Sequence, residues 1–181
     1  ISAYEQIPFQ YSLHIEYEDG TLEHKEFLAE DGFDSRYDFA KSLVENIPSN
    51  VTVLAYNMSF EKSVIRKLAN LYGEFTYDLM NIHNNIQDLM LPFQKKWYTT
   101  SSMQGSYSIK YVLPTLVPEF EKAYKDLELV HNGSEAMSVY ANLKNLSNAE
   151  KIVYKKALLE YCKLDTLAMV RILEVLRRTK I

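Results

Sequence analysis

The chain is poor in the residues that mark several classes of protein. Its 181 residues include one cysteine, five glycines and five prolines, and apolar residues nowhere form a long uninterrupted run. A single cysteine, Cys162, cannot form an internal disulfide, which argues against a disulfide-stapled secreted scaffold. A membrane-spanning helix needs about 18 or more consecutive apolar residues. We therefore expect a cytoplasmic protein with no membrane partner.

Basic residues are also too few for one class of nucleic-acid-binding protein. Twenty Lys and Arg face 24 Asp and Glu, so the formal net charge is −4. Such a chain does not coat nucleic acid electrostatically. The charge still permits an enzyme that holds a nucleic-acid end through metal ions. The four histidines show no spacing typical of zinc ligands.

Hydrophobic periodicity predicts a single α/β domain over residues 1–181. Residues 8–17 and 22–29 alternate apolar and polar side chains around Asp19-Gly20, a dipeptide that favours a tight hairpin turn. Residues 35–47 have helical spacing and start at a potential N-cap, Ser35. This order of elements indicates a mixed sheet flanked by helices. The other patterns predict a strand at 51–56 and helices at 61–73, 78–91, 107–116 and 148–178.

One carboxylate in the last predicted helix lies on an apolar face. A buried carboxylate is costly unless it is paired, hydrogen-bonded or bound to a metal. Asp165 therefore needs a partner that its neighbours in sequence do not provide. At 3.6 residues per turn, the apolar stripe consists of Leu158, Cys162, Asp165, Met169, Ile172 and Leu176.

The junction after the predicted strand 51–56 offers such a partner. Ligands of open α/β sheets bind beyond the carboxyl ends of the strands, where Asn57 and Glu61 follow the strand. If the last helix packs across the same edge, Asp165 and Tyr161 converge on Glu61. Two carboxylates that meet in a cleft repel each other unless a divalent cation lies between them.

Two motifs carry a resemblance to a known superfamily. Tyr161-Cys162-Lys163-Leu164-Asp165 reads Tyr-x-x-x-Asp, and Asn57-Met58-Ser59-Phe60-Glu61 is close to Asn-x-x-Phe-Asp. The pair resembles the DEDD (DnaQ-like) 3′–5′ exonucleases of the ribonuclease H-like fold. The blocks "QIPFQYSLH", "AYNMSFEKSVI", "DLMLPF", "SIKYVLPTL" and "YCKLDTLAMV" are similar to a bacterial DnaQ-like family of unknown function, often found behind a RecB-like nuclease module.

The resemblance implies hydrolysis of nucleic-acid phosphodiesters by two Mg²⁺ or Mn²⁺ ions. Asp165 would bind a metal directly, and Glu61 would hold the metal shell through water. Tyr161 would orient the attacking water, while Asn57 and Phe60 would contact substrate near the scissile end. The implied partners are a single-stranded 3′ end and an upstream nuclease module of the same polypeptide.

The first motif of these enzymes, Asp-x-Glu on the first strand, does not occur ahead of residues 8–17. In the fold that the resemblance implies, this strand is central, between the hairpin and the strand at 51–56. Three explanations are open: a fragment of a longer protein, a degenerate copy, or a strand donated by a partner chain. We favour the fragment and predict that the chain alone is inactive or very weak. Sheet edges left without the strand also allow a homodimer.

Residues 92–110 contain a second candidate for substrate contact. Lys95 and Lys96 stand beside Trp97 and Tyr98, which combines phosphate-neutralising charge with a stacking surface. A surface loop around a partly buried tryptophan has the same pattern.

Each candidate also has a purely structural interpretation. Tyr161 fits a core aromatic, and Asp165 a buried hydrogen-bond acceptor. Asn57 fits a turn residue and Glu61 a first-turn acid that favours the helix dipole. Asp88 could support the site, but we favour a solvated helical face for it. The alternative function is accordingly a non-catalytic module that positions nucleic acid or a partner within a larger nuclease.

Overall fold

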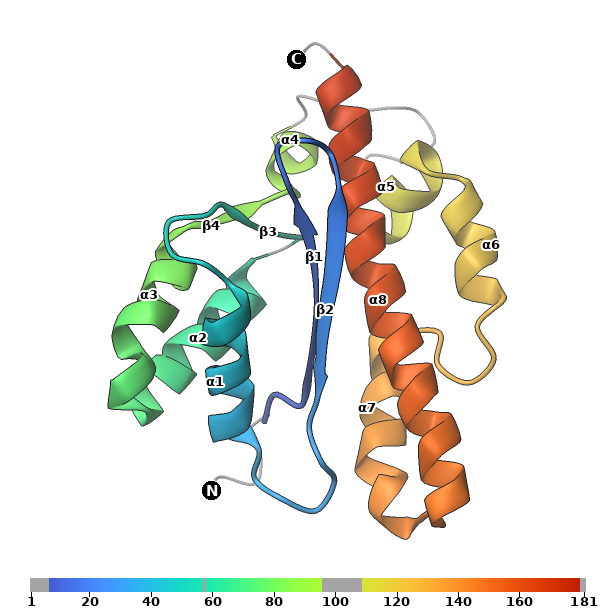
Figure 1. Ribbon diagram of the computed structural model, residues 1–181. Helices are drawn as coiled ribbons and strands as arrows, with labels where there is room; N and C mark the ends of the chain where they lie inside the picture. Colours follow the sequence, from blue (N-terminus) through green and yellow to red (C-terminus); the bar gives the residue numbers. More distant parts are fainter. Residues whose placement is uncertain (1–6, 57, 96–108, 180–181) are drawn as a thin grey trace.

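The chain folds into a mixed α/β structure (Figure 1). The computed structural model describes residues 7–56, 58–95 and 109–179. In chain order its elements are β1 (Gln10–Glu16), β2 (Leu22–Leu28), α1 (Arg36–Asn46), β3 (Val53–Ala55), α2 (Ser59–Leu71), η1 (Gly73–Phe75), α3 (Thr76–Asn84), β4 (Ile86–Asp88), α4 (Leu91–Gln94), α5 (Ile109–Leu116), α6 (Glu119–Lys125), α7 (Gly133–Asn142), η3 (Leu143–Asn145) and α8 (Asn148–Arg178).

The described strands form two separate sheets where the sequence predicts one mixed sheet. β1 and β2 make the expected antiparallel hairpin, with Gly20 at φ 85° in its turn. β3 pairs in parallel with β4. Within the described ranges, β1 and β3 each pair on one side only.

The predicted helix over 78–91 is wrong in its second half. α3 ends at Asn84, and Ile86–Asp88 form β4. Asn84 and Asn85 are weak helix formers, and the amide of Asn85 bonds the carbonyl of Asn81 to close the helix. Ile86–Asp88 are extended because they pair with β3, and local hydrophobic periodicity does not predict such pairing.

The hairpin separates two layers of helices (Figure 1). On one face Tyr11 is buried and its hydroxyl lies 2.5 Å from the Ser42 hydroxyl of α1. On the other face Gln10 donates to the carbonyl of Leu158, and Ser12 lies 2.9 Å from the Thr166 hydroxyl. The period-two alternation of β1 thus places one set of side chains against α1 and the other against α8.

α8 matches its predicted bounds of 148–178. Ser147 caps it in a capping box with Glu150, which satisfies orphan backbone donors at its start. Leu158, Ile172 and Leu176 of the predicted stripe are buried. The predicted N-cap of α1 is only partly confirmed. Ser35 stands at that position without a side-chain cap.

Three apolar clusters make up the core. The first cluster joins the hairpin to α1, α2 and α3. The second joins α4, α5 and α6 to the carboxyl-terminal half of α8. The third joins α7 to the amino-terminal half of α8. No helix in the described part of the chain is long and apolar enough to cross a membrane.

Candidate functional site

Two carboxylates lie close enough to interact electrostatically beyond the carboxyl ends of the parallel strands β3 and β4. Asp88 is the last residue of β4, and Glu61 lies in the first turn of α2, just after β3. The Asp88 carboxylate accepts hydrogen bonds from the backbone N–H groups of Met58, at 3.0 Å, and Met90, at 2.9 Å. Asp88 therefore fixes both chain segments that leave the sheet at this edge.

The charge of Asp88 acts on its neighbours. Burial of its carboxyl among protein atoms raises the pKa of Glu61, and the nearby Asp88 charge adds to this rise. Glu61 as a whole is nevertheless a solvent-exposed residue. Burial also raises the pKa of Tyr56, again with a contribution from Asp88. We name Tyr56, Glu61 and Asp88 the strand-edge group.

Asp165 has its own partners on the helical side of the molecule. Its carboxylate accepts a hydrogen bond of 2.5 Å from the hydroxyl of Tyr124 in α6 and another from Tyr161, one turn earlier in α8. Burial raises the pKa of Asp165, and the two hydroxyl donors oppose that rise only in part. We name Tyr124, Tyr161 and Asp165 the tyrosine–aspartate group. It supplies the partner that an aspartate on an apolar stripe requires.

The hydroxyls and the thiol around Asp165 hold their protons firmly. Burial raises the pKa of Tyr124 and of Tyr161, and the Asp165 charge raises both further. Burial and the same charge raise the pKa of the Cys162 thiol to about 12. At neutral pH these groups therefore stay protonated and are poor bases or nucleophiles.

The two groups share one apolar cluster but not their polar contacts. Tyr56 and Leu54 pack in the same cluster as Tyr124 and Ala168, so α8 does pack toward this edge of the sheet. The described polar contacts of Asp165 are with tyrosines of α6 and α8. Glu61 instead responds to Asp88. The predicted meeting of Asp165 and Tyr161 with Glu61 is not among these contacts.

A two-metal centre does not fit the described residues as they stand. Within the described ranges, no group of three or more His, Cys, Asp or Glu side chains is placed to hold a metal ion. Glu61 and Asp88 supply two carboxylates, and Asp165 is hydrogen-bonded elsewhere.

The predicted substrate contacts are only partly within the described residues. Asn57, Lys96 and Trp97 lie outside them. Phe60 is exposed, with 56% of its surface accessible, beside Glu61 at the start of α2. Lys95 is exposed at the end of α4.

Two residues of these groups were missed or misjudged at the level of sequence. Asp88 ends a strand and bonds two backbone amides, whereas a solvated helical face was favoured for it. A recognisable strand at 86–88 would have placed it beside Glu61. Tyr124 is 41 residues from Asp165, and no local pattern connects the two.

Comparison with known proteins identifies the family of this chain. A protein of Ureaplasma parvum serovar 3 (strain ATCC 700970), named Uncharacterized protein UU173, is 29% identical over 99 residues. These residues are 50% of the chain and 14% of that protein, so the chain spans a small part of its relative. No solved structure matches the chain significantly. The family model described as Domain of unknown function (DUF2779) matches residues 1–108, and the chain therefore belongs to the DUF2779 family.

Proposed function

We propose that this chain is the greater part of a metal-dependent 3′–5′ exonuclease domain of the DnaQ type. The observation that carries the proposal is the acidic pair Glu61 and Asp88 at the carboxyl ends of two parallel strands. This is the edge at which open α/β sheets bind ligands. The exposed ring of Phe60, next to Glu61 in the sequence, offers a surface on which a terminal base can stack.

The split sheet supports a site that needs one more strand. β1 and β3 belong to separate sheets, and the resemblance to DnaQ-like enzymes puts an Asp-x-Glu strand between them. Such a strand would add two carboxylates to Glu61 and Asp88, and in this proposal Asp165 leaves its tyrosine donors to bind the metal directly. We propose that Mg²⁺ or Mn²⁺ binds only then, and that the 181-residue chain alone is inactive or very weak.

The experiment compares this chain with a version extended upstream through an Asp-x-Glu strand. Each is incubated with Mn²⁺ and a 5′-labelled single-stranded oligonucleotide. Asp165→Asn and Glu61→Gln are the test variants, and Asp126→Asn is the matched control because Asp126 is exposed and forms a surface ion pair with Lys122. We expect a ladder of shortened products from the extended protein and its control variant alone. A ladder from the short chain, or an extended protein that leaves the substrate intact, contradicts the proposal.

A second function follows from the tyrosine–aspartate group. Asp165 already has two hydroxyl donors, so its burial needs no metal. This favours a non-catalytic module that positions nucleic acid or a partner within a larger nuclease. Oligonucleotide binding by the extended protein in EDTA, without cleavage when Mn²⁺ is added, would support this second function over the first.

A further inference from the structure

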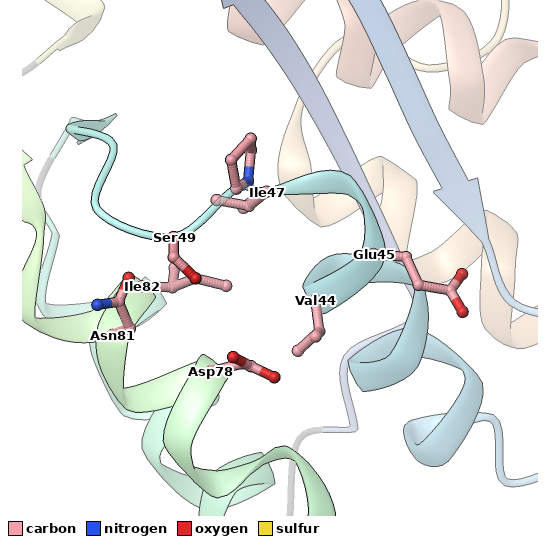
Figure 2. Close-up of a pocket in the computed structure, with 8 residues that line it drawn as sticks. Val44, Glu45, Ile47, Ser49, Asp78, Asn81 and Ile82 are labelled. Carbon is pink, nitrogen blue, oxygen red and sulfur yellow. The ribbon is translucent and has the colours of Figure 1, made fainter.

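A cavity of about 360 Å³ lies between α1 and α3, away from both acidic groups (Figure 2). Its volume falls within the range of small-ligand sites. Its walls come from the last turn of α1, the loop that follows and one face of α3. The lining residues are Val44, Glu45, Ile47, Pro48, Ser49, Asp78, Asn81 and Ile82.

The charge at this cavity is negative. Figure 2 shows the Asp78 carboxylate directed into the space between the helices, whereas Glu45 points away from it. α1 ends at the cavity without a basic residue in its last turn. Carbonyl groups at the end of a helix carry partial negative charge, which favours a cation there.

Asp78 is a half-buried acid that, unlike Asp31, has no cation partner among the described residues. Asp31 is paired with Lys151 and Lys155, and its pKa is lowered to about 2, chiefly by hydrogen bonds from these lysines. Among the described residues, Asp78 takes part in no ion pair. A cation that enters the cavity therefore meets a carboxylate that is paired with no cation in the described part of the chain.

The rest of the cavity suits an aliphatic chain, and the loop at its rim is held in place by hydrogen bonds. Val44, Ile47 and Ile82 are apolar. The loop after α1 is clamped to α3 by two hydrogen bonds of 3.0 Å between Asn50 and Asn81, with Asn50 in the left-handed region at φ 61°. These hydrogen bonds lie within the chain, so the loop that forms the rim of the cavity is ordered without a ligand.

We propose that this cavity binds a guanidinium or primary ammonium group carried on a short aliphatic chain. Asp78 binds the charged head, the end of α1 contributes its carbonyl dipoles, and the apolar residues cover the methylene groups. This site is separate from the proposed nuclease site, so either proposal can fail without the other.

The test is a titration of the 181-residue chain with butylguanidine, followed by NMR shifts of Ser49 and Ile82 and by calorimetry. We expect saturable binding with a dissociation constant on the order of 1 mM. Asp78→Asn should weaken it by about fivefold or more, and Glu45→Gln by less than about twofold. Pentanamide, a neutral analogue of similar shape, should bind at least about fivefold more weakly than butylguanidine.

A peptide with one central arginine and blocked ends distinguishes a protein side chain from a free small molecule as the natural source. Tighter binding of the peptide than of butylguanidine assigns the cavity to an arginine of a partner protein, and weaker binding assigns it to a free amine or guanidine. Equal binding of pentanamide, no effect of Asp78→Asn, or no saturable binding overturns the proposal. The comparison with pentanamide needs no variant, so it holds even if Asp78→Asn fails to fold.

Discussion

Asp88 and Asp165 are both half-buried carboxylates, but they accept hydrogen bonds from different kinds of donor. Asp88 bonds two backbone N–H groups beyond the ends of strands, and its charge acts on the exposed residue Glu61. Asp165 bonds two tyrosine hydroxyls, one of them from another helix. Backbone donors fix the path of the chain where it leaves the sheet. Tyrosine donors fill the space around the acid and join two helices.

The largest expected effect comes from removing the acceptor at the strand edge. Asp88→Ala leaves the amides of Met58 and Met90 without their partner and should lower the free energy of unfolding by about 2–3 kcal/mol. Urea denaturation measures the change. Asp126→Ala, at an exposed ion pair, is the control and should cost less than about 0.5 kcal/mol. An equal cost at both positions would mean that Asp88 has no special structural role.

The next effect is the coupling between Tyr124 and Asp165. A double-mutant cycle with Tyr124→Phe and Asp165→Asn should give a coupling free energy of about 1–2 kcal/mol, since a charged acceptor strengthens the bond. Tyr140→Phe replaces Tyr124→Phe in the control cycle, because Tyr140 contacts backbone carbonyls near the hairpin. A coupling no larger than that of the control cycle would show that the two helices are joined by packing alone.

A smaller effect is the dependence of stability on pH. The folded-state pKa of Asp165 is raised above its ordinary value of 3.8, so the native state retains a proton that the unfolded state releases. Stability from this group is therefore present below pH 3.8 and is lost as the pH rises through the folded-state value. Asp165→Asn should remove this falling component, seen as a flatter curve of unfolding free energy from pH 3 upward.

Asp31 provides the opposite sign within the same molecule. Its folded-state pKa is lowered to about 2, so its contribution is present above its ordinary value of 3.8 and is lost as the pH falls toward 2. Asp31→Asn should therefore remove stability at neutral pH and have little effect below pH 2. The same slope for both variants would contradict the assigned environments.

The smallest effect on stability is expected at Phe60. Its ring is 56% exposed, so Phe60→Ala should change the free energy of unfolding by less than about 0.5 kcal/mol. Binding of a single-stranded oligonucleotide to the extended protein should weaken by about 1–3 kcal/mol if a base stacks on this ring. Unchanged affinity in a fluorescence anisotropy titration would remove Phe60 from the substrate surface.

Local patterns predicted the parts of the fold that rest on local forces. The hairpin follows from alternation around Asp19-Gly20, and α8 from a long amphipathic repeat with Ser147 as its cap. β4 was missed because its three residues depend on pairing with β3. Each residue of β4 pairs with the residue 33 positions before it in the sequence. An aspartate on an apolar stripe correctly indicated a need for a partner. One partner, Tyr161, lies one turn earlier in the same helix, which contradicts the expectation that its neighbours in sequence supply none. The other, Tyr124, depends on the tertiary packing of α6, which no spacing encodes.

Calorimetric titration with Mn²⁺ tests most directly the claim that an upstream strand completes a metal site on this fold. We predict no measurable site in the 181-residue chain, binding in the version extended through an Asp-x-Glu strand, and loss of that binding in its Asp165→Asn and Glu61→Gln variants. Binding to the extended protein that survives both substitutions, or no binding to it, would contradict the claim.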